Sequence, residues 1–264
     1  MNIFMRELKA NLRSLLIWGV IVILFVWVGI SKFSAYEGNP EMLAILNEMP
    51  PAMLAALNMK AFNLTTVTGF YGLMFTYFAL LLSIAAAMWG SDIISKEERD
   101  KTVEFSLTLP VTRSRLVTAK TLAVLVNCMG LLLIAWGASL VSAAQYRPDS
   151  EFYRFLRLGM LALFITQLTF LAIGIFLGCA MKQYKRASSV AVSLLLGTYF
   201  LSVISGLDQD MEFLRYFSPF KYFDAGVLLR ESRIEMTFVW LSLAIMLVSM
   251  VGAYLTYSRR DLYI

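Results

Sequence analysis

Few residues in this chain have the chemistry of a catalytic site. The chain contains no histidine, and its two cysteines, Cys128 and Cys179, both lie inside long apolar runs. Most zinc sites and hydrolytic triads use histidine, and the paired aspartates that an intramembrane aspartyl protease would need within its spans are also missing. We therefore expect no catalytic residue, no metal site and no intramembrane enzyme, and we interpret the two thiols as small apolar side chains.

An energy source for transport is also missing from the chain itself. It has no phosphate-binding loop of the form G-x-x-x-x-G-K-[ST]. The middle of each apolar run lacks Lys, Arg, Asp and Glu, whereas proton-driven carriers place ionisable groups at that depth. The strongest polar groups there are Asn127 and Gln167, which suit hydrogen bonds between helices better than substrate binding. If this chain pumps a solute, another polypeptide must supply the energy at the cytosolic face. A stand-alone channel would need a hydrophilic stripe, and none is visible.

Six apolar runs predict an all-α membrane protein. Of the 264 residues, 59% are hydrophobic and only 16% are charged. About 20 apolar residues are enough for a helix to cross the hydrocarbon core of a bilayer. No soluble domain fits between the runs, so we expect a single transmembrane domain over residues 1–264. The predicted spans are Leu15–Ser31, Thr66–Gly90, Leu116–Ala144, Leu156–Met181, Ala187–Leu207 and Met236–Tyr257.

The distribution of basic residues predicts that both termini are cytoplasmic. With the N-terminus inside, the inner segments hold 14 of the 23 Lys and Arg residues, and cytoplasmic loops carry such an excess. Basic residues between Arg147 and Arg157 lie on the outer side and run against this rule. Because the net charge of +5 is explained by topology, we expect no nucleic-acid partner.

The first 14 residues predict an amphipathic helix. Apolar residues recur every four positions, and basic residues lie between them. Such a helix lies on the inner membrane surface with its basic side toward anionic head groups. The alternative is that it is the cytoplasmic start of the first span. The residues concerned are Phe4, Leu8 and Leu12 on the apolar side and Arg6, Lys9 and Arg13 on the basic side.

The inner segment between the second and third spans has the pattern of a short helix. Ser95 followed by Glu97 and Glu98 suits a helix start, with acidic residues in the first turn. Pro110 ends the element, and Thr112 is placed to cap the helix that follows.

Apolar residues on this short helix are candidates for a docking surface. Phe105, Leu107 and Leu109 lie in a segment that is too polar to enter the bilayer. A short helix with apolar residues and a charged rim suits docking to another protein. The alternative is that these side chains pack against the ends of the chain's own helices.

At this segment the sequence resembles the permease subunits of ABC-2-type ATP-binding-cassette transporters. The stretch 97–113 is similar to the family pattern E-x-x-x-G-T-x-E-x-L-L-x-L-P-V-S-R, with Lys101 in place of the usual Gly and Thr112 in place of the usual Ser. Segments 49–57, 216–223 and 259–262 are also similar to the family, in order, so the resemblance covers nearly the whole chain. The matching residues in the first stretch are Thr102, Glu104, Leu107, Leu109, Pro110, Val111 and Arg113.

The resemblance implies a division of labour between subunits. Two permease copies, identical or related, pair with two cytoplasmic ABC ATPase subunits in the bacterial inner membrane. ATP and Mg bind to the ATPase, and this chain binds no cofactor. The segment between spans two and three becomes a cytoplasmic coupling helix, and short re-entrant helices follow span five on the outside. The coupling residues are then Glu98, Thr102, Glu104, Phe105, Leu107, Leu109 and Pro110.

The composition of the spans indicates the kind of cargo. They offer hydroxyl, aromatic and Met side chains but no polar cluster for a hydrophilic substrate. We expect a hydrophobic or amphipathic cargo, such as a peptide, an antibiotic or a lipid, moved outward as the family resemblance implies. The Met-rich segment 42–59 is either an outer release surface or a pair of interfacial helices split by Pro50 and Pro51. A non-transporting membrane scaffold or sensor subunit is the alternative function.

Overall fold

The protein is a bundle of long helices. The computed structural model describes residues 3–39, 48–50, 53–54, 59, 62–99, 112–181, 183–207 and 209–259, and no strand occurs among them. Six of its helices are long and apolar enough to cross a membrane. They are α1 (Ile3–Ser31), α4 (Val67–Arg99), α6 (Arg113–Ala143), α7 (Ser150–Ala180), α8 (Tyr184–Ile204) and α11 (Met236–Arg259).

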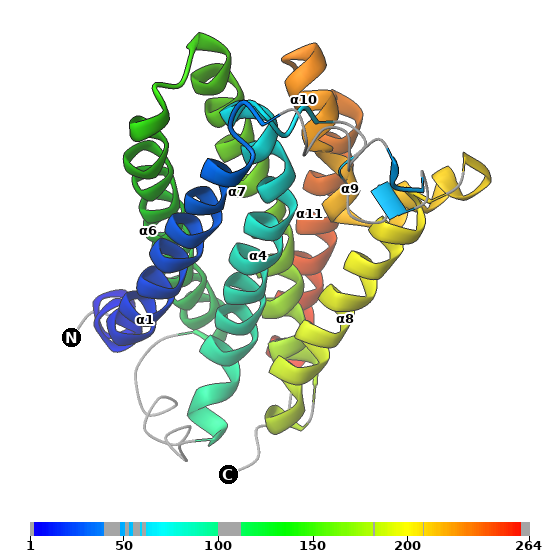
Figure 1. The fold of residues 1–264 in the computed structure, drawn as a ribbon. Coiled ribbons are helices and arrows are strands. Elements are labelled where there is room, and N and C mark those ends of the chain that lie inside the picture. Colours follow the sequence, from blue (N-terminus) through cyan, green and yellow to red (C-terminus); the bar gives the residue numbers. More distant parts are fainter. Residues whose placement is uncertain are drawn as a thin grey trace.

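Short helices join the spans at one end of the bundle. Helix α1 begins and α11 ends at the lower end in Figure 1, which we call the base, and the short helices lie at the opposite end, the top. The short elements are η1 (Lys32–Ala35), η2 (Ala144–Tyr146), η3 (Gln209–Phe217), α9 (Pro219–Tyr222) and α10 (Ala225–Glu231). Three of them follow α8, where the sequence predicts short helices, and their entry into a membrane stays a prediction.

Helices α4 and α7 form the centre of the bundle because small residues let their backbones touch. A Cβ atom added to Gly174 would lie 2.6 Å from the carbonyl oxygen of Ala87, and one added to Gly178 would lie 2.7 Å from that of Ser91. On the other side of the seam, a Cβ at Gly90 would lie 2.6 Å from the carbonyl oxygen of Leu171. Small residues support such close helix packing where lipid removes the usual hydrophobic drive for association.

The outer helices expose apolar side chains. Leu16 on α1 is 60% exposed and Trp240 on α11 is 69% exposed, whereas Phe170 on α7 is 1% exposed. Helices that are apolar on their outward faces as well as inside are typical of a bundle surrounded by lipid. The arrangement in Figure 1 agrees, because α1, α6, α8 and α11 surround the α4–α7 pair.

Two sequence-based expectations change in the structure. The N-terminal helix is continuous with the first span as α1, which agrees with the alternative that it is the start of that span, so the predicted boundary at Leu15 is wrong. Ser95 does not begin a helix, because α4 continues through it to Arg99. The reason is the environment of Glu97, which is buried by contacts with other helices and therefore extends α4 beyond the apolar run that ends at Gly90. The predicted cap is confirmed, since the Thr112 hydroxyl oxygen accepts a hydrogen bond from the backbone N–H of Arg115.

Replacing Gly174 with Ala should loosen the centre of the bundle. The added methyl would press on the backbone of Ala87, and overpacking of this kind typically destabilises by about 1–3 kcal/mol. Thermal unfolding in detergent should show a lower midpoint. Gly197→Ala on α8 is the matched control, because a Cβ there meets nothing within 4 Å, so its midpoint should stay the same or rise. Equal effects of the two changes would contradict the close α4–α7 seam.

Candidate functional site at the base of the bundle

Five charged side chains form an alternating row at the base, which we call the charge chain: Lys96, Glu7, Arg6, Glu97 and Lys120. Arg6 Nη2 lies 3.1 Å from Glu7 Oε1 and 3.2 Å from Glu97 Oε1. Lys120 Nζ lies 3.1 Å from the same Glu97 oxygen, and Lys96 pairs with Glu7. The row therefore links α1, α4 and α6 through opposite charges.

Three members of the charge chain, Glu7, Glu97 and Lys120, are buried, so each of them needs an oppositely charged partner. Lys120 is 0% exposed and Glu7 is 2% exposed. The Lys120 ammonium also donates a hydrogen bond to the carbonyl oxygen of Ile93 at 2.8 Å. Removing charges from water is expensive, so a buried ion that loses its partner destabilises a protein strongly. Three cations face two carboxylates, so Arg6 and Lys120 share Glu97 and the row keeps one positive charge in excess.

A second contact joins the first turn of α6 to the last turn of α11. Arg113 Nη1 donates to the carbonyl oxygens of Tyr257 and Ser258, at 3.3 Å each. One helical turn further, the hydroxyls of Thr118 and Tyr254 lie 2.8 Å apart. A guanidinium at the C-terminal end of a helix satisfies free carbonyl groups and is favoured by the helix dipole. Arg113 therefore fixes the end of α11 to the start of α6.

Two further hydrogen bonds extend the network to the remaining helices near the base. The indole N–H of Trp89 donates to the Ser14 hydroxyl at 2.8 Å, which joins α4 to α1. The hydroxyls of Ser91 and Ser188 lie 2.9 Å apart and join α4 to α8. Together with the α4–α7 seam, these contacts connect all six spans through the half of α4 nearer the base and the start of α6.

These contacts involve the two helices that precede and follow the predicted coupling segment in the sequence. Helix α4 ends at Arg99 and α6 begins at Arg113, so both helices that flank residues 100–111 are fixed at the base. The coupling residues themselves, which are Thr102, Glu104, Phe105, Leu107, Leu109 and Pro110, lie outside the described residues, and so does the side chain of Glu98. Their roles stay predictions.

The predicted interfacial helix divides between the protein interior and its surface. Arg6 takes part in the charge chain, whereas Lys9, Leu12 and Arg13 are exposed. Phe4 and Leu8 are partly buried. The exposed part leaves one apolar and two basic side chains free to meet a membrane surface, and that role stays a prediction.

Sequence reasoning missed the two residues that matter most here. Glu7 is the only acidic residue before Ser31, and Lys120 is the only charged residue between Leu116 and Ala144. In each segment this lone charge was the feature of the sequence that could have marked the residue as one that needs a partner. Their pairing could not be read from spacing, because Arg6 and Glu97 are 91 positions apart.

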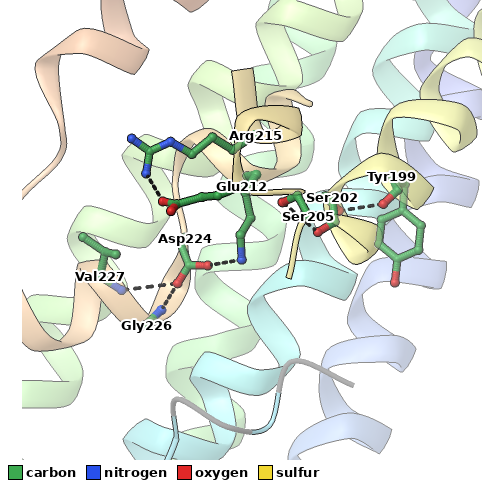
Figure 2. Close-up of polar contacts among 9 residues, drawn as sticks. Tyr199, Ser202, Ser205, Glu212, Arg215, Asp224, Gly226 and Val227 are labelled. Carbon is green, nitrogen blue, oxygen red and sulfur yellow. Dashed lines mark hydrogen bonds and ion pairs between the residues drawn. The ribbon is translucent and has the colours of Figure 1, made fainter. Parts of the chain in front are cut away.

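The top of the bundle carries a second polar group, around a cavity of about 200 Å³ between η3, α9, α10 and the start of α11. Figure 2 shows Arg215 donating to Glu212, and Asp224 accepting from the backbone N–H groups of Gly226 and Val227. Lys221 Nζ donates to Asp224 Oδ2 at 2.7 Å. Much of the charge around this cavity is therefore neutralised by near neighbours in the chain.

Aromatic contacts hold this top structure against α8 and α11. The rings of Tyr222 and Phe238 stack with centroids 5.1 Å apart, and the Tyr222 hydroxyl donates to the carbonyl oxygen of Tyr216. Burial raises the pKa of Tyr222 to about 12. Burial also acts to raise the pKa of Asp224, but Lys221 and the two backbone N–H groups outweigh it, and the net pKa lies below the ordinary value. The top cavity is thus a tightly paired cap between two spans.

A comparison with protein families decides the class of this bundle. The model of the ABC-2 family transporter proteins matches residues 1–262. The chain belongs to the ABC-2 transporter family. This ABC-2 protein is a membrane permease of an ABC transporter, and the ATPase activity of such transporters resides in separate subunits, with which the permease associates. No curated protein matches the chain.

Family membership gives the charge chain its significance. The permease associates with a separate ATPase, and the charge chain joins three spans near one end of the bundle. The charge chain and the Arg113 contact fix the last turn of α4 and the first turn of α6, which flank residues 100–111 in the sequence.

Replacing Lys120 with Met should destabilise this permease strongly. The change leaves Glu97 buried with one cation fewer, and breaking a buried pair typically destabilises by about 3–5 kcal/mol. Thermal unfolding in detergent measures the effect. Combining it with Glu97→Gln should recover part of the loss, because the buried side chain at position 97 then carries no charge that needs the missing ammonium. Arg233→Gln, in the exposed pair with Glu231, should change stability by less than about 1 kcal/mol. If Lys120→Met leaves the midpoint of thermal unfolding unchanged, the charge chain does not hold the base together.

Proposed function

We propose that this chain is the permease of an ABC exporter and that it moves a hydrophobic or amphipathic cargo outward with ATP hydrolysed on a separate subunit. The observation that carries the proposal is the arrangement around residues 100–111. The helices on both sides of this segment are tied to α1 and α11 by the charge chain and by Arg113. A displacement of the segment would therefore be passed to several spans at once.

The base is assigned to the cytoplasm. The excess of Lys and Arg favours this side, and ATP is available there. In this orientation both termini are cytoplasmic, and Lys9 and Arg13 on the exposed side of α1 meet the inner leaflet of a bacterial cell membrane. The top cap then faces outward.

The coupling segment works as a docking element. Phe105, Leu107 and Leu109 enter a groove on the ATPase, and Thr102 and Glu104 take part in the contact as the family pattern implies. Closing of the ATPase displaces the segment, and because packed interfaces switch between discrete arrangements, the inner ends of α4 and α6 move together with their partners. The proposal thus gives the buried charge chain a mechanical role in addition to its effect on stability.

The assembly contains two ATPase subunits and a second permease copy, identical or related. ATP and Mg bind to the ATPase subunits. The exposed apolar faces of α1, α6, α8 and α11 provide surface for lipid and for the second copy. The absence of charged residues in the middle of the described spans supports a cargo that is apolar over most of its surface, such as a lipid, an antibiotic or a hydrophobic peptide.

Replacing Phe105, Leu107 and Leu109 together with Asp should abolish association with the ATPase while membrane insertion is retained. Three carboxylates cannot enter an apolar groove without losing their hydration. Association is measured by co-purification of the ATPase with tagged permease from membranes. The control is Phe213→Asp, which places one carboxylate on an exposed apolar residue at the top and should leave association intact.

Normal co-purification of the triple variant would refute the docking role. If the wild-type complex assembles but ATP hydrolysis moves no lipid, antibiotic or peptide in proteoliposomes, the chain is instead a scaffold or sensor subunit. Transport by the chain alone in liposomes, with no companion subunit, would overturn the proposal entirely.

A further inference from the structure

Three polar side chains lie fully buried in the middle of the bundle without hydrogen-bond partners. Ser83 on α4, Asn127 on α6 and Gln167 on α7 are each 0% exposed. The Ser83 hydroxyl and both polar atoms of each amide have no partner among the described residues. The sequence-based interpretation of Asn127 and Gln167 as hydrogen-bonding links between helices is therefore not confirmed.

The three side chains lie at nearly the same depth. Two contacts fix the register of α4 against α6, because the Tyr71 hydroxyl meets that of Ser139 and the Lys120 ammonium meets the carbonyl of Ile93. Interpolating between these contacts places Asn127 beside residues 84–85 of α4, within one turn of Ser83.

The contact between Ala87 and Gly174 sets the register of α4 against α7. Ser83 lies four residues before Ala87, and Gln167 lies seven residues before Gly174. The difference of three residues corresponds to about 4.5 Å along the helix axis. All three polar side chains therefore belong to one layer of the bundle, about midway along the long helices.

The same contacts show that the three side chains face one another's helices. Positions seven apart lie on the same face of an α-helix. Gln167 therefore shares the face of Gly174, which touches α4, and Ser83 shares that of Gly90, which touches α7. Asn127 lies seven residues after Lys120, whose side chain points to α4. We call this group the polar layer.

The polar layer is unfavourable in the closed bundle. A buried polar group without a partner typically destabilises by about 1–3 kcal/mol, whereas an apolar group of the same shape avoids that loss. Native proteins leave few such groups unpaired. Five polar atoms in one layer therefore indicate that these groups have partners in another arrangement of the helices.

The packing of α1, α4, α6 and α7 next to the polar layer leaves a small void. A small cavity of about 10 Å³ lies on the top side of the polar layer, lined among others by Leu82, Leu163 and Ser139. This volume is close to that of one water-sized probe. On the base side the seam between α6 and α4 carries the buried ion pair of Lys120 and Glu97. Polar or loosely filled sites thus follow one another along this seam.

We propose that Ser83, Asn127 and Gln167 form a binding site inside a single permease bundle for neutral hydrogen-bonding groups, which opens when α6 moves away from α4 and α7. Water enters first, and uncharged amide or hydroxyl groups of an amphipathic cargo bind in its place. Ions are disfavoured because the layer contains no charge to pair with them, and cations are disfavoured further because the excess positive charge of the charge chain lies on its base side. The opening motion rests on the proposed function, since residues 100–111 connect α4 directly to α6.

The neighbouring thiol provides a test. Cys128 follows Asn127 and is 0% exposed, and Cys179 is the only other cysteine of the chain. A Cys179→Ser variant, purified with its ATPase, is treated with hydroxyethyl methanethiosulfonate or with its trimethylammonium-ethyl counterpart. Modification of the Cys128 peptide is followed by mass spectrometry without nucleotide, during ATP turnover and in the vanadate-trapped state. A Cys128→Ser variant that keeps Cys179 measures background access from the base.

During turnover or in the trapped state, modification of Cys128 should rise at least tenfold, and the neutral reagent should react several-fold faster than the cationic one. If the complex hydrolyses ATP while Cys128 stays protected, the site does not open and this inference fails alone. If both reagents react equally, the preference for neutral groups is wrong. If no ATPase partner exists, the proposed function fails and takes this inference with it.

Stability measurements separate the proposed site from ordinary helix contacts. Asn127→Leu and Gln167→Met remove unpaired amides with little change in shape, so the midpoint of thermal unfolding should rise and modification of Cys128 should slow. Ser139→Ala removes a buried hydroxyl that does have partners, Tyr71 and Ala135, so its midpoint should fall. Lower midpoints for all three variants would show that the amides are paired in the closed bundle, which would overturn the proposal.

Discussion

Lys120 sets the strictest condition on the structure, because its ammonium is fully buried and must have Glu97 and the Ile93 carbonyl within reach. The Glu97 carboxylate reaches Lys120 only if α4 continues as a helix past the end of its apolar run. Glu97 in turn pairs with Arg6 of α1. A single buried charge thus fixes the length of one helix and the position of two others. The base of the bundle is ordered by electrostatic pairing, whereas the centre is ordered by glycine contacts between backbones.

The fold was largely predictable, because a bilayer imposes simple rules on a sequence. Long apolar runs specified six helices, and Thr112 marked the start of α6 correctly. The predicted ends of the helices were less accurate where contacts between helices overrode the local sequence preference. Ser95 has the properties of a helix-capping residue, yet the pairing of Glu97 keeps α4 helical through it. Local pattern cannot weigh a contact with a residue far along the chain.

The candidate site was less predictable than the fold. The row of Lys96, Glu7, Arg6, Glu97 and Lys120 joins three segments, and its order depends on how the helices cross. Asn127 and Gln167 were recognised as the notable polar groups of the spans, but their lack of partners appears only when burial and distances are known. The sequence shows that a polar side chain lies within an apolar span, but only the packing of the helices shows whether that side chain has a hydrogen-bond partner.

The glycine contacts between α4 and α7 have a mechanical consequence. With backbone against backbone at Gly90, Gly174 and Gly178, neither helix can rotate about its own axis without driving a residue that has a side chain into its neighbour. The two helices therefore form one stiff beam, and α4 alone, with 33 residues, is roughly 50 Å long. Tilting such a beam by ~5° about one end displaces the other by about 4 Å. A small tilt that begins at the base of the bundle would thus become a movement the width of a methylene chain at its top.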